Sequence, residues 1–358
     1  YNATQGFWCF SGRLSPYAGN MRPEKIYFVR PPQDKPVVFE NPLSMLEELE
    51  NAVSKEADII VVNIEQTQLM LKEGGVYSEL LKKFSRKPTR GLTERILFLK
   101  ELIAEMKLDS GNHLVDAWQH LYRGVDDTSL RRLFYYSVFL YGCMSSRFLV
   151  RPFVPMPELL TDEEKSYYKK YVFDSLDRTD FELDLLNIHG LRNEFMGRTL
   201  EEAERGVICW NSVLSSLSMA RESMKRAVAE TSSTAKSYLE DSLLRIDTVM
   251  CFARNLRNCC KFQSMLDRAK SIGFSKLANS EKLENVMRDE LDNTEELIHL
   301  LETAKAPLLP TADSPDRETT FLFGPDLAAQ LRMKRKIMLR HWRDSQVLFE
   351  FKNRFNQI

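Results

Sequence analysis

Apolar residues are spaced differently in the first hundred residues than in the rest of the chain. The stretches GFWCFSG (6–12) and KIYFVR (25–30) are rich in aromatic or β-branched residues and are bounded by Gly or Pro. This composition and these boundaries are typical of strands. The N-terminal region is therefore expected to contain a small number of strands, too few to close a barrel.

Residues 42–66 are predicted to form a helix and then a buried strand. Leu46, Leu49 and Val53 form the apolar stripe of the helix. The continuous apolar run 59–62 that follows is typical of a strand covered on both faces. A helix followed by a buried strand is the order found in an α/β unit.

From Thr93 onward, the period of the apolar residues is that of helices. Thr93 is predicted to cap a helix whose apolar side includes Leu97, and Asn112 to cap the next helix. Thr161 and Glu164 are three residues apart, as in a capping box, and so predict a further helix start.

Three long helices are predicted over residues 199–230, 234–272 and 281–305. At the rise of an α-helix, the second would be about 60 Å long, so these helices are expected to pack lengthwise against one another. A loop rich in Pro, Asp and Thr separates them from a last helix, predicted over 326–350.

The fold class predicted from these patterns is mainly α, in two domains. At 358 residues the chain exceeds the usual size of a single core. The first domain is a short N-terminal α/β segment over 1–110, and the end of a β/α barrel region is one interpretation of it. The second domain, over 111–358, is a large bundle of long antiparallel helices.

Composition and charge argue against several classes of protein. The chain has 43% hydrophobic and 28% charged residues, which is ordinary for a folded protein. Its net charge of −1 argues against a nucleic-acid partner, because nucleic-acid binders normally carry a basic surplus. No run of about 18 apolar residues occurs, so no membrane span is expected. The oligomeric state stays open.

The cysteines and histidines predict neither a metal site nor a cofactor. The six cysteines lack CxxC spacing, and buried free thiols are favoured over a disulfide framework or a zinc site. The histidines lack metal-ligand spacing. The compartment stays open, because a chain that begins at Tyr1 is expected to be processed or partial, and a signal peptide could have preceded it. The cytoplasm and, with such a peptide, the periplasm or the exterior are all compatible.

Glu65 is the candidate catalytic residue. It follows closely on the predicted buried strand, and polar residues just past the ends of parallel strands face the ligand site in α/β proteins. A carboxylate there could act as a general acid or base. The alternative is that Glu65 lies in the first turn of a following helix and interacts favourably with the helix dipole.

Five further residues are candidates for substrate binding. Trp8, Arg13 and Tyr17 combine aromatic rings with a guanidinium group near a Gly/Ser/Pro loop, a combination that suits sugars, although they could equally form a core edge. Asn112 and His113 open a predicted helix. His113 could bond a ligand hydroxyl, whereas a helix cap and a solvated histidine are the structural alternatives.

Arg147 and Arg151 lie where a predicted helix meets a proline-rich stretch. Two arginines there could hold a carboxylate or a set of sugar hydroxyls through their forked geometry. The alternative is that they cap the free carbonyls at the end of the helix.

The basic run 332–343 is amphipathic and could be a membrane-surface helix. A bundle helix with a solvated basic face is the favoured interpretation, because the acidic helix over 281–302 can balance its charge.

Three segments together resemble a known kind of protein: GNHLVDAWQHLYRG (111–124), YGCMSSRFLVRPFVPMPELLTDEEK (141–165) and the stretch from LLETAKAPLLP to LRHWRD (300–344). They look like the C-terminal portions of large bacterial glycoside-hydrolase-like proteins. In those proteins an α-glucuronidase- or hexosaminidase-like (β/α) barrel is followed by a helical domain.

This resemblance implies a carbohydrate-active fragment that contributes to a saccharide site, with an acidic sugar as the ligand best suited to the arginines. It also implies that the region before residue 110 is the tail of the barrel and that most catalytic residues precede Tyr1. If such a fragment is an enzyme, its chemistry would be hydrolysis of a glycosidic bond by two carboxylates. The alternative from a different class is a non-catalytic helical scaffold or protein-interaction domain.

Overall fold

The structure is a computed structural model of the chain. It describes residues 6–10, 13–15, 24–29, 39–62, 74–108, 112–125, 149–156, 159–170, 200–231, 233–271, 276–309, 311–318 and 323–346. The chain divides into two compact units, each of which is described by itself. Unit 1 comprises Tyr1–Asp126 and Ser218–Ile246, and unit 2 comprises Asp127–Leu217 and Asp247–Ile358. The domain boundary predicted near residue 110 stays a prediction.

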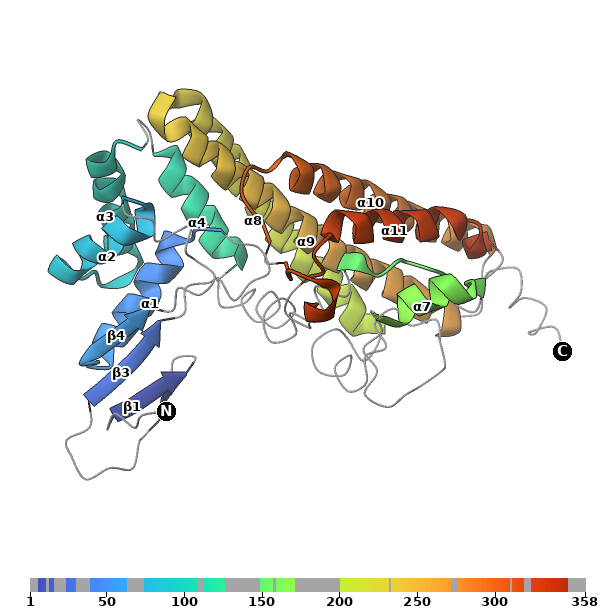
Figure 1. The fold of residues 1–358 in the computed structure, drawn as a ribbon, viewed down its shortest axis with the longest axis horizontal. Helices are drawn as coiled ribbons and strands as arrows, with labels where there is room; N and C mark the ends of the chain where they lie inside the picture. Colours follow the sequence, from blue (N-terminus) through green and yellow to red (C-terminus); the bar gives the residue numbers. More distant parts are fainter. Residues whose placement is uncertain are drawn as a thin grey trace. The chain divides into compact units, whose positions relative to one another are not determined.

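Unit 1 begins with a four-stranded sheet in the order β2-β1-β3-β4. Its strands are β1 (Gly6–Phe10), β2 (Arg13–Ser15), β3 (Glu24–Val29) and β4 (Ile59–Val62). The pairs β1–β3 and β3–β4 are parallel, and β2 runs antiparallel to β1. Both strands expected before residue 31 are therefore confirmed, and three of the four strands run in one direction (Figure 1).

The prediction that residues 59–62 form a strand is confirmed, but the prediction that this strand is buried is wrong. Ile59 is 39% exposed, and the other three residues of β4 are only partly buried. The reason is position, because β4 lies at one end of the described sheet. The inner strand β3 instead supplies the buried side chains, among them Tyr27 and Val29.

Four helices follow in unit 1: α1 (Pro42–Ser54), α2 (Val76–Arg86), α3 (Gly91–Met106) and α4 (His113–Val125). Proline at the first position of α1 favours a helix start there, because its fixed φ suits the first turn. Leu46 and Leu49 are buried as predicted, but Val53 is 45% exposed and Ala52 takes its place on the buried side.

Helix α3 begins two residues before Thr93, so the predicted cap is wrong. The backbone N–H of Arg90 donates to Glu94 Oε2 at 2.7 Å, and that of Gly91 donates to Glu50 Oε2 of α1 at 3.1 Å. These carboxylates satisfy N–H groups at a helix start whose N-cap, Arg90, lies three residues before the predicted one. Leu97, expected on the apolar side, is 55% exposed.

A buried arginine ties three of these helices together. Arg95 of α3 forms ion pairs with Glu50 (Nε–Oε2, 3.4 Å) and Glu47 (Nη1–Oε1, 3.8 Å) of α1. The Tyr122 hydroxyl of α4 donates to Glu47 Oε1 at 2.8 Å. Because the guanidinium group is paired on more than one side, its burial is tolerated.

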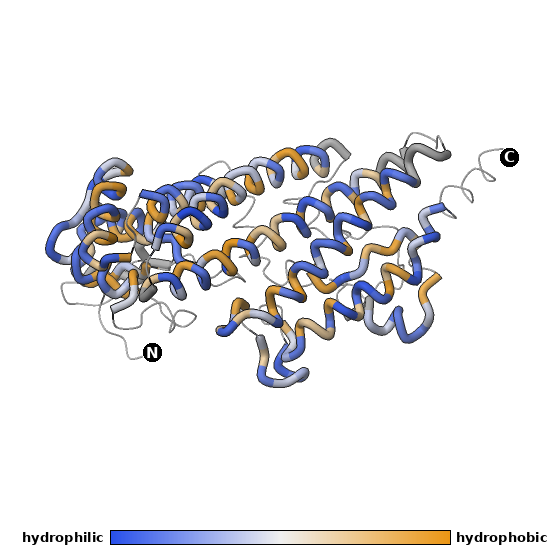
Figure 2. Tube along the Cα trace, turned by 90° about the horizontal axis from the view of Figure 1, so that it is seen from above, coloured by the Kyte–Doolittle hydropathy of each residue, from blue (hydrophilic) through white to orange (hydrophobic). Residues whose placement is uncertain are grey.

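The long helices are confirmed close to their predicted bounds: α8 (Leu200–Glu230), α9 (Ser233–Ser271) and α10 (Lys276–Thr303). The last part of α8 and the first part of α9 belong to unit 1, and the remainder of each belongs to unit 2. The coloured parts of these helices in Figure 2 carry both hydrophilic and hydrophobic residues. Within the described residues, no helix is long and apolar enough to span a membrane.

Unit 2 also contains α7 (Asp162–Lys170), the 3₁₀ turn η4 (Pro315–Arg317) and α11 (Leu327–Arg340). The capping box before α7 is confirmed, because Thr161 N donates to Glu164 Oε2 at 2.9 Å and Glu164 N donates to Thr161 Oγ1 at 3.3 Å. The chain is thus a mainly α protein with a short N-terminal α/β segment and a large helical bundle, as predicted.

The predicted helix 326–350 is interrupted: α11 is followed by a turn over 341–343, and residues 344–346 are helical again. Asp326 caps α11 by accepting from Ala329 N at 2.9 Å, and the helix ends at His341. There the imidazole bonds Glu164 Oε2 (3.0 Å) through Nε2 and Asp344 Oδ2 (2.7 Å) through Nδ1. These side-chain bonds hold the turn in which the helix stops.

Helix α11 lies beside the acidic helix α10, as the favoured interpretation of the basic run required (Figure 1). Arg332 pairs with Glu302, and Arg335 pairs with Glu295. One residue departs from the expectation of a solvated basic face, because Lys334 is completely buried and pairs with Glu290.

Candidate functional site

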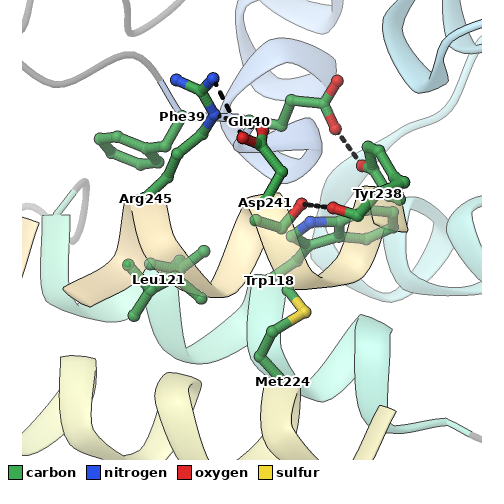
Figure 3. A pocket seen from close by; sticks show the side chains of 10 residues that line it. Phe39, Glu40, Trp118, Leu121, Met224, Tyr238, Asp241 and Arg245 are labelled. Carbon is green, nitrogen blue, oxygen red and sulfur yellow. Dashed lines mark hydrogen bonds and ion pairs between the residues drawn. The ribbon is translucent and has the colours of Figure 1, made fainter. Parts of the chain in front are cut away.

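Unit 1 contains a small cavity where the chain enters α1 and where α4, α8 and α9 meet (Figure 3). Its volume is about 80 Å³. It is lined by Phe39, Glu40, Trp118, Leu121, Met224, Tyr238, Asp241, Ser242, Arg245 and Ile246. Half of this lining is apolar, and the polar half gathers on Glu40 and one face of α9.

The polar face follows directly from helix geometry. Tyr238, Asp241, Ser242 and Arg245 are spaced three or four residues apart, so they share one side of α9. Glu40 reaches this side from the residues that precede α1 (Figure 3). Residues about 200 positions apart in the sequence therefore form one polar cluster.

Glu40 is the titratable group that best distinguishes this cavity. The Tyr238 hydroxyl donates a hydrogen bond to Glu40 Oε2. Burial of the carboxyl raises the pKa of Glu40 to about 7, although the Tyr238 hydrogen bond and the charge of Arg245 act in the opposite direction. The nearby charge of Asp241 adds to the increase in pKa. Near neutral pH, Glu40 can therefore both give and take a proton.

The second carboxyl of the cavity is held in a different way. Arg245 Nε donates to Asp241 Oδ2 at 2.7 Å, one helical turn away (Figure 3). The Arg245 side chain is almost fully buried, whereas that of Asp241 is 38% exposed, so the cavity reaches solvent at the aspartate. Ser242 Oγ donates to the Tyr238 carbonyl of the same helix at 2.9 Å, so this hydroxyl bonds the backbone of α9 and not Glu40.

The size of the cavity limits what it can hold. A single water needs about 10–15 Å³ of such volume, so 80 Å³ suffices for a few waters or one functional group of a ligand. A complete sugar ring would not fit, because small-molecule pockets are usually about 300–1,000 Å³.

Of the predicted binding residues, Trp8 and Arg13 lie on neighbouring strands. In the register of β1 and β2, Trp8 is opposite Ser15, and Arg13 is opposite Phe10. The sheet thus brings these two positions close together in unit 1. Tyr17 lies outside the described residues, so the aromatic site predicted for the three stays a prediction.

Asn112 and His113 lie at the start of α4, as predicted. The Asn112 carbonyl accepts from Asp116 N at 2.9 Å, which is the backbone bond expected of a helix start. His113 Nε2 lies 3.2 Å from Glu230 Oε1 at the end of α8, and its side chain is 28% exposed. The ring thus has a partner within the protein, and its role toward a ligand stays a prediction.

Arg151 lies in unit 2 and is only 2% exposed. Glu65 and Arg147 lie outside the described residues. The roles predicted for these three residues therefore stay predictions.

Unit 2 has a buried polar cluster of its own, centred on Glu290. Its Oε1 accepts from Lys334 Nζ and from Asn255 Nδ2 (2.7 Å), and its Oε2 accepts from Asn258 Nδ2 (2.9 Å). Lys334 also donates to the Leu149 carbonyl at 2.8 Å. Glu290 and Lys334 are both fully buried, so this cluster connects three helices and presents no surface to a ligand.

Sequence reasoning missed the main residues of the cavity: Glu40, Tyr238, Asp241 and Arg245. The last three have the spacing of an ordinary helix face, which on its own indicates only solvation. The one available signal was Glu40, a charged residue directly after the apolar run VVF and before the predicted helix entry. Among the described residues, no group of three or more His, Cys, Asp or Glu side chains is arranged to hold a metal ion.

Comparison with known proteins finds likeness in structure alone. No family model matches the chain, and no curated protein matches it. A solved structure that it resembles is that of a GH138 enzyme targeting pectin rhamnogalacturonan II, with a TM-score of 0.52 and 12% sequence identity. The match covers 94% of this chain and 48% of the enzyme, so this chain spans about half its length. At this identity the likeness shows a shared fold, that of part of a glycoside hydrolase.

Proposed function

We propose that the chain is part of a carbohydrate-active, glycoside-hydrolase-like protein and that Glu40 supplies a proton-exchanging carboxyl to its saccharide site. The observation that carries this proposal is the raised pKa of Glu40, about 7, in a cavity that reaches solvent. A general acid or base works best when its pKa is close to the working pH. The fold likeness to a glycoside hydrolase supports the reaction class.

Hydrolysis of a glycosidic bond requires two carboxyl groups with different protonation states. In this proposal Glu40 donates its proton to the glycosidic oxygen of a sugar at the cavity mouth. Asp241, paired with Arg245, is the second carboxylate of the same cavity. Glu65 remains a candidate as well, because it follows β4, and the carboxyl ends of the parallel strands β3 and β4 share one edge of the sheet.

An acidic sugar stays the proposed ligand. Arg245 is the basic residue that lines the cavity, and a guanidinium group that pairs with Asp241 has further N–H donors that could bond a second carboxylate. The enzyme with the similar fold targets pectin rhamnogalacturonan II, so pectic oligosaccharides are the first substrates to test.

The test compares Glu40→Gln with Glu240→Gln, an exposed glutamate next to Asp241 on α9. In the complete protein that carries this chain, Glu40→Gln is expected to lower the rate of hydrolysis of pectic oligosaccharides by about 10²–10⁴-fold. Glu240→Gln should leave the rate unchanged. Equal rates in the two variants would remove Glu40 from the mechanism. A thermal-shift screen with uronic acids and neutral sugars in which none stabilises the protein would favour the non-catalytic scaffold instead.

A further inference from the structure

A second hollow in unit 1, the α2–α3 groove, lies between the basic face of α2 and the end of α3. It is lined by Gly74, Glu79, Lys82, Lys83, Arg86, Lys87, Leu102, Glu105 and Met106. Its volume is about 490 Å³, within the range of about 300–1,000 Å³ that is usual for small-molecule sites. The groove is therefore large enough for sugar rings, whereas the cavity at Glu40 is not.

Charge is concentrated at this groove although the whole chain is nearly neutral. The residues that line the groove include four basic and two acidic side chains, a net charge of +2, against −1 for the complete chain. The sequence KKFSRKPTR (82–90) contributes five of the basic residues and no acidic one. A local positive surface on a neutral protein favours an anionic ligand that binds at this place rather than unspecific attraction to polyanions.

The ion pairs in the groove are exposed and can be exchanged. Lys82 pairs with Glu79 at 2.8 Å and is 53% exposed, and Lys87 pairs with Glu101 at 3.4 Å and is 68% exposed. Such surface pairs contribute little to stability, so a carboxylate of a ligand can replace the glutamate at little cost. Arg86 is exposed and has no carboxylate partner among the described residues.

The groove also has apolar and fixed parts. Met106 of α3 is partly exposed and lines the groove, where it can contact the C–H face of a sugar ring, whereas Leu102 is only 2% exposed and packs behind the lining. Lys83 is held in place, because it pairs with Glu105 (2.6 Å) and Glu101 (3.2 Å) and its Nζ lies 5.5 Å from the centre of the Phe98 ring. Only part of the basic surface must therefore become ordered when a ligand binds.

We infer that the α2–α3 groove is an accessory binding site for a polysaccharide chain that carries carboxylates, separate from the cavity at Glu40. Arg86, Lys82 and Lys87 would bind carboxylates of successive sugar residues, while Met106 contacts a ring. The inference rests on the proposed function, since it assigns this unit a polymeric acidic saccharide. It adds a surface that holds the polymer without taking part in bond cleavage.

The test measures binding of a homogalacturonan oligomer to the complete chain by isothermal titration calorimetry. The double variant Arg86→Gln/Lys87→Gln is compared with Lys225→Gln/Lys236→Gln, which removes the same charge elsewhere in unit 1. The groove variant is expected to lose about tenfold in affinity, since it removes two exposed charge contacts, and the control less than twofold. The fully methyl-esterified oligomer, which has no carboxylates, should bind the wild type at least tenfold more weakly.

Three results would overturn the inference. One is equal affinity of the groove and control variants for the acidic oligomer, and another is equal affinity of the wild type for the esterified oligomer. The third concerns a single-stranded DNA oligomer. If it binds the wild type as tightly as the acidic oligosaccharide does, and loses as much affinity in the groove variant, the groove is a general polyanion site. Glu40→Gln separates the two proposals, because oligomer binding at the groove should survive it even if Glu40 proves to have no catalytic role.

Discussion

Glu40 of unit 1 and Glu290 of unit 2 are two glutamates in helical surroundings with opposite chemical situations. Glu290 is fully buried and accepts from Lys334, Asn255 and Asn258, so both of its oxygens have partners and a counter-charge. Among the described residues, Glu40 has one hydrogen-bond donor, Tyr238, and it borders a cavity. Burial with full compensation produces a structural ion pair, whereas burial with partial compensation leaves a carboxyl that exchanges protons.

The difference shows why burial alone does not identify a functional carboxyl. A buried charge is tolerated when an opposite charge and hydrogen bonds replace water. At Glu290 those groups come from α9 and α11 and fill the space around the carboxylate. At Glu40 the nearest cation, Arg245, is already paired with Asp241, so desolvation outweighs the attraction and the pKa rises.

The largest effect on stability is expected from breaking the buried ion pair between Lys334 and Glu290. Lys334→Met should lower the free energy of unfolding by about 3–5 kcal/mol, because it leaves the Glu290 carboxylate buried without its counter-charge. Chemical denaturation at neutral pH measures this effect. Lys336→Met, on the exposed side of the same helix, is the matched control and should change stability by no more than about 0.5 kcal/mol.

The double variant Lys334→Met/Glu290→Leu sharpens the same comparison. It is expected to recover most of the lost stability, because neither charge then remains buried. A cost of Lys334→Met similar to that of Lys336→Met would mean that the pair is not the buried, mutually dependent unit seen in the structure.

The next effect concerns the pH dependence of stability at Glu40. A folded pKa of about 7, above the ordinary 4.5, means that the folded state holds a proton that the unfolded state releases. The contribution of Glu40 to stability is therefore complete below pH 4.5 and is lost as the pH rises toward 7. Allowing for partial exposure, the loss is on the order of 2 kcal/mol.

Glu40→Gln should remove this loss. The difference in unfolding free energy between the variant and the wild type is then expected to grow from pH 4.5 to pH 7 in favour of the variant. Denaturation series at several pH values measure it, with Glu240→Gln as the control. A difference that stays constant over this range would place the pKa of Glu40 at its ordinary value and contradict the comparison with Glu290.

The local pattern of the sequence predicted much of this fold, including the bounds of α8, α9 and α10 to within a few residues. Helical periodicity and capping chemistry, as at Thr161 and Glu164, are local properties, so they can be recognised along a single chain. Local patterns could not predict that the Lys334 side chain is buried or that the residues of β4 are partly exposed. The first depends on Glu290 of a different helix, and the second on the position of a strand at the end of its sheet.

The cavity could not be predicted for the same reason. Glu40 and Tyr238 are 198 residues apart, and neither lies in a motif. Only the contact of α9 with the residues before α1 turns an ordinary polar helix face into a desolvated site. The predicted residues Trp8 and Arg13 share a sheet in unit 1. They were predicted to bind a ligand from their residue types alone, and residue type gives no information on burial.

The smallest effect tests the one hydrogen bond that partly compensates Glu40. Tyr238→Phe removes the hydroxyl that donates to Glu40 Oε2, so the ionised carboxylate loses stabilisation and the pKa of Glu40 should rise above 7, by about 0.5–1. A carboxyl ¹³C NMR titration measures this pKa directly.

Ser242→Ala is the control, because the Ser242 hydroxyl bonds the Tyr238 carbonyl and not Glu40. This variant should leave the pKa of Glu40 unchanged. An unchanged pKa in Tyr238→Phe would mean that burial and the charges of Asp241 and Arg245 alone set the protonation of Glu40. The contrast with Glu290 would then lie in burial and in the counter-charge that Lys334 gives Glu290, not in the hydrogen bond to Glu40.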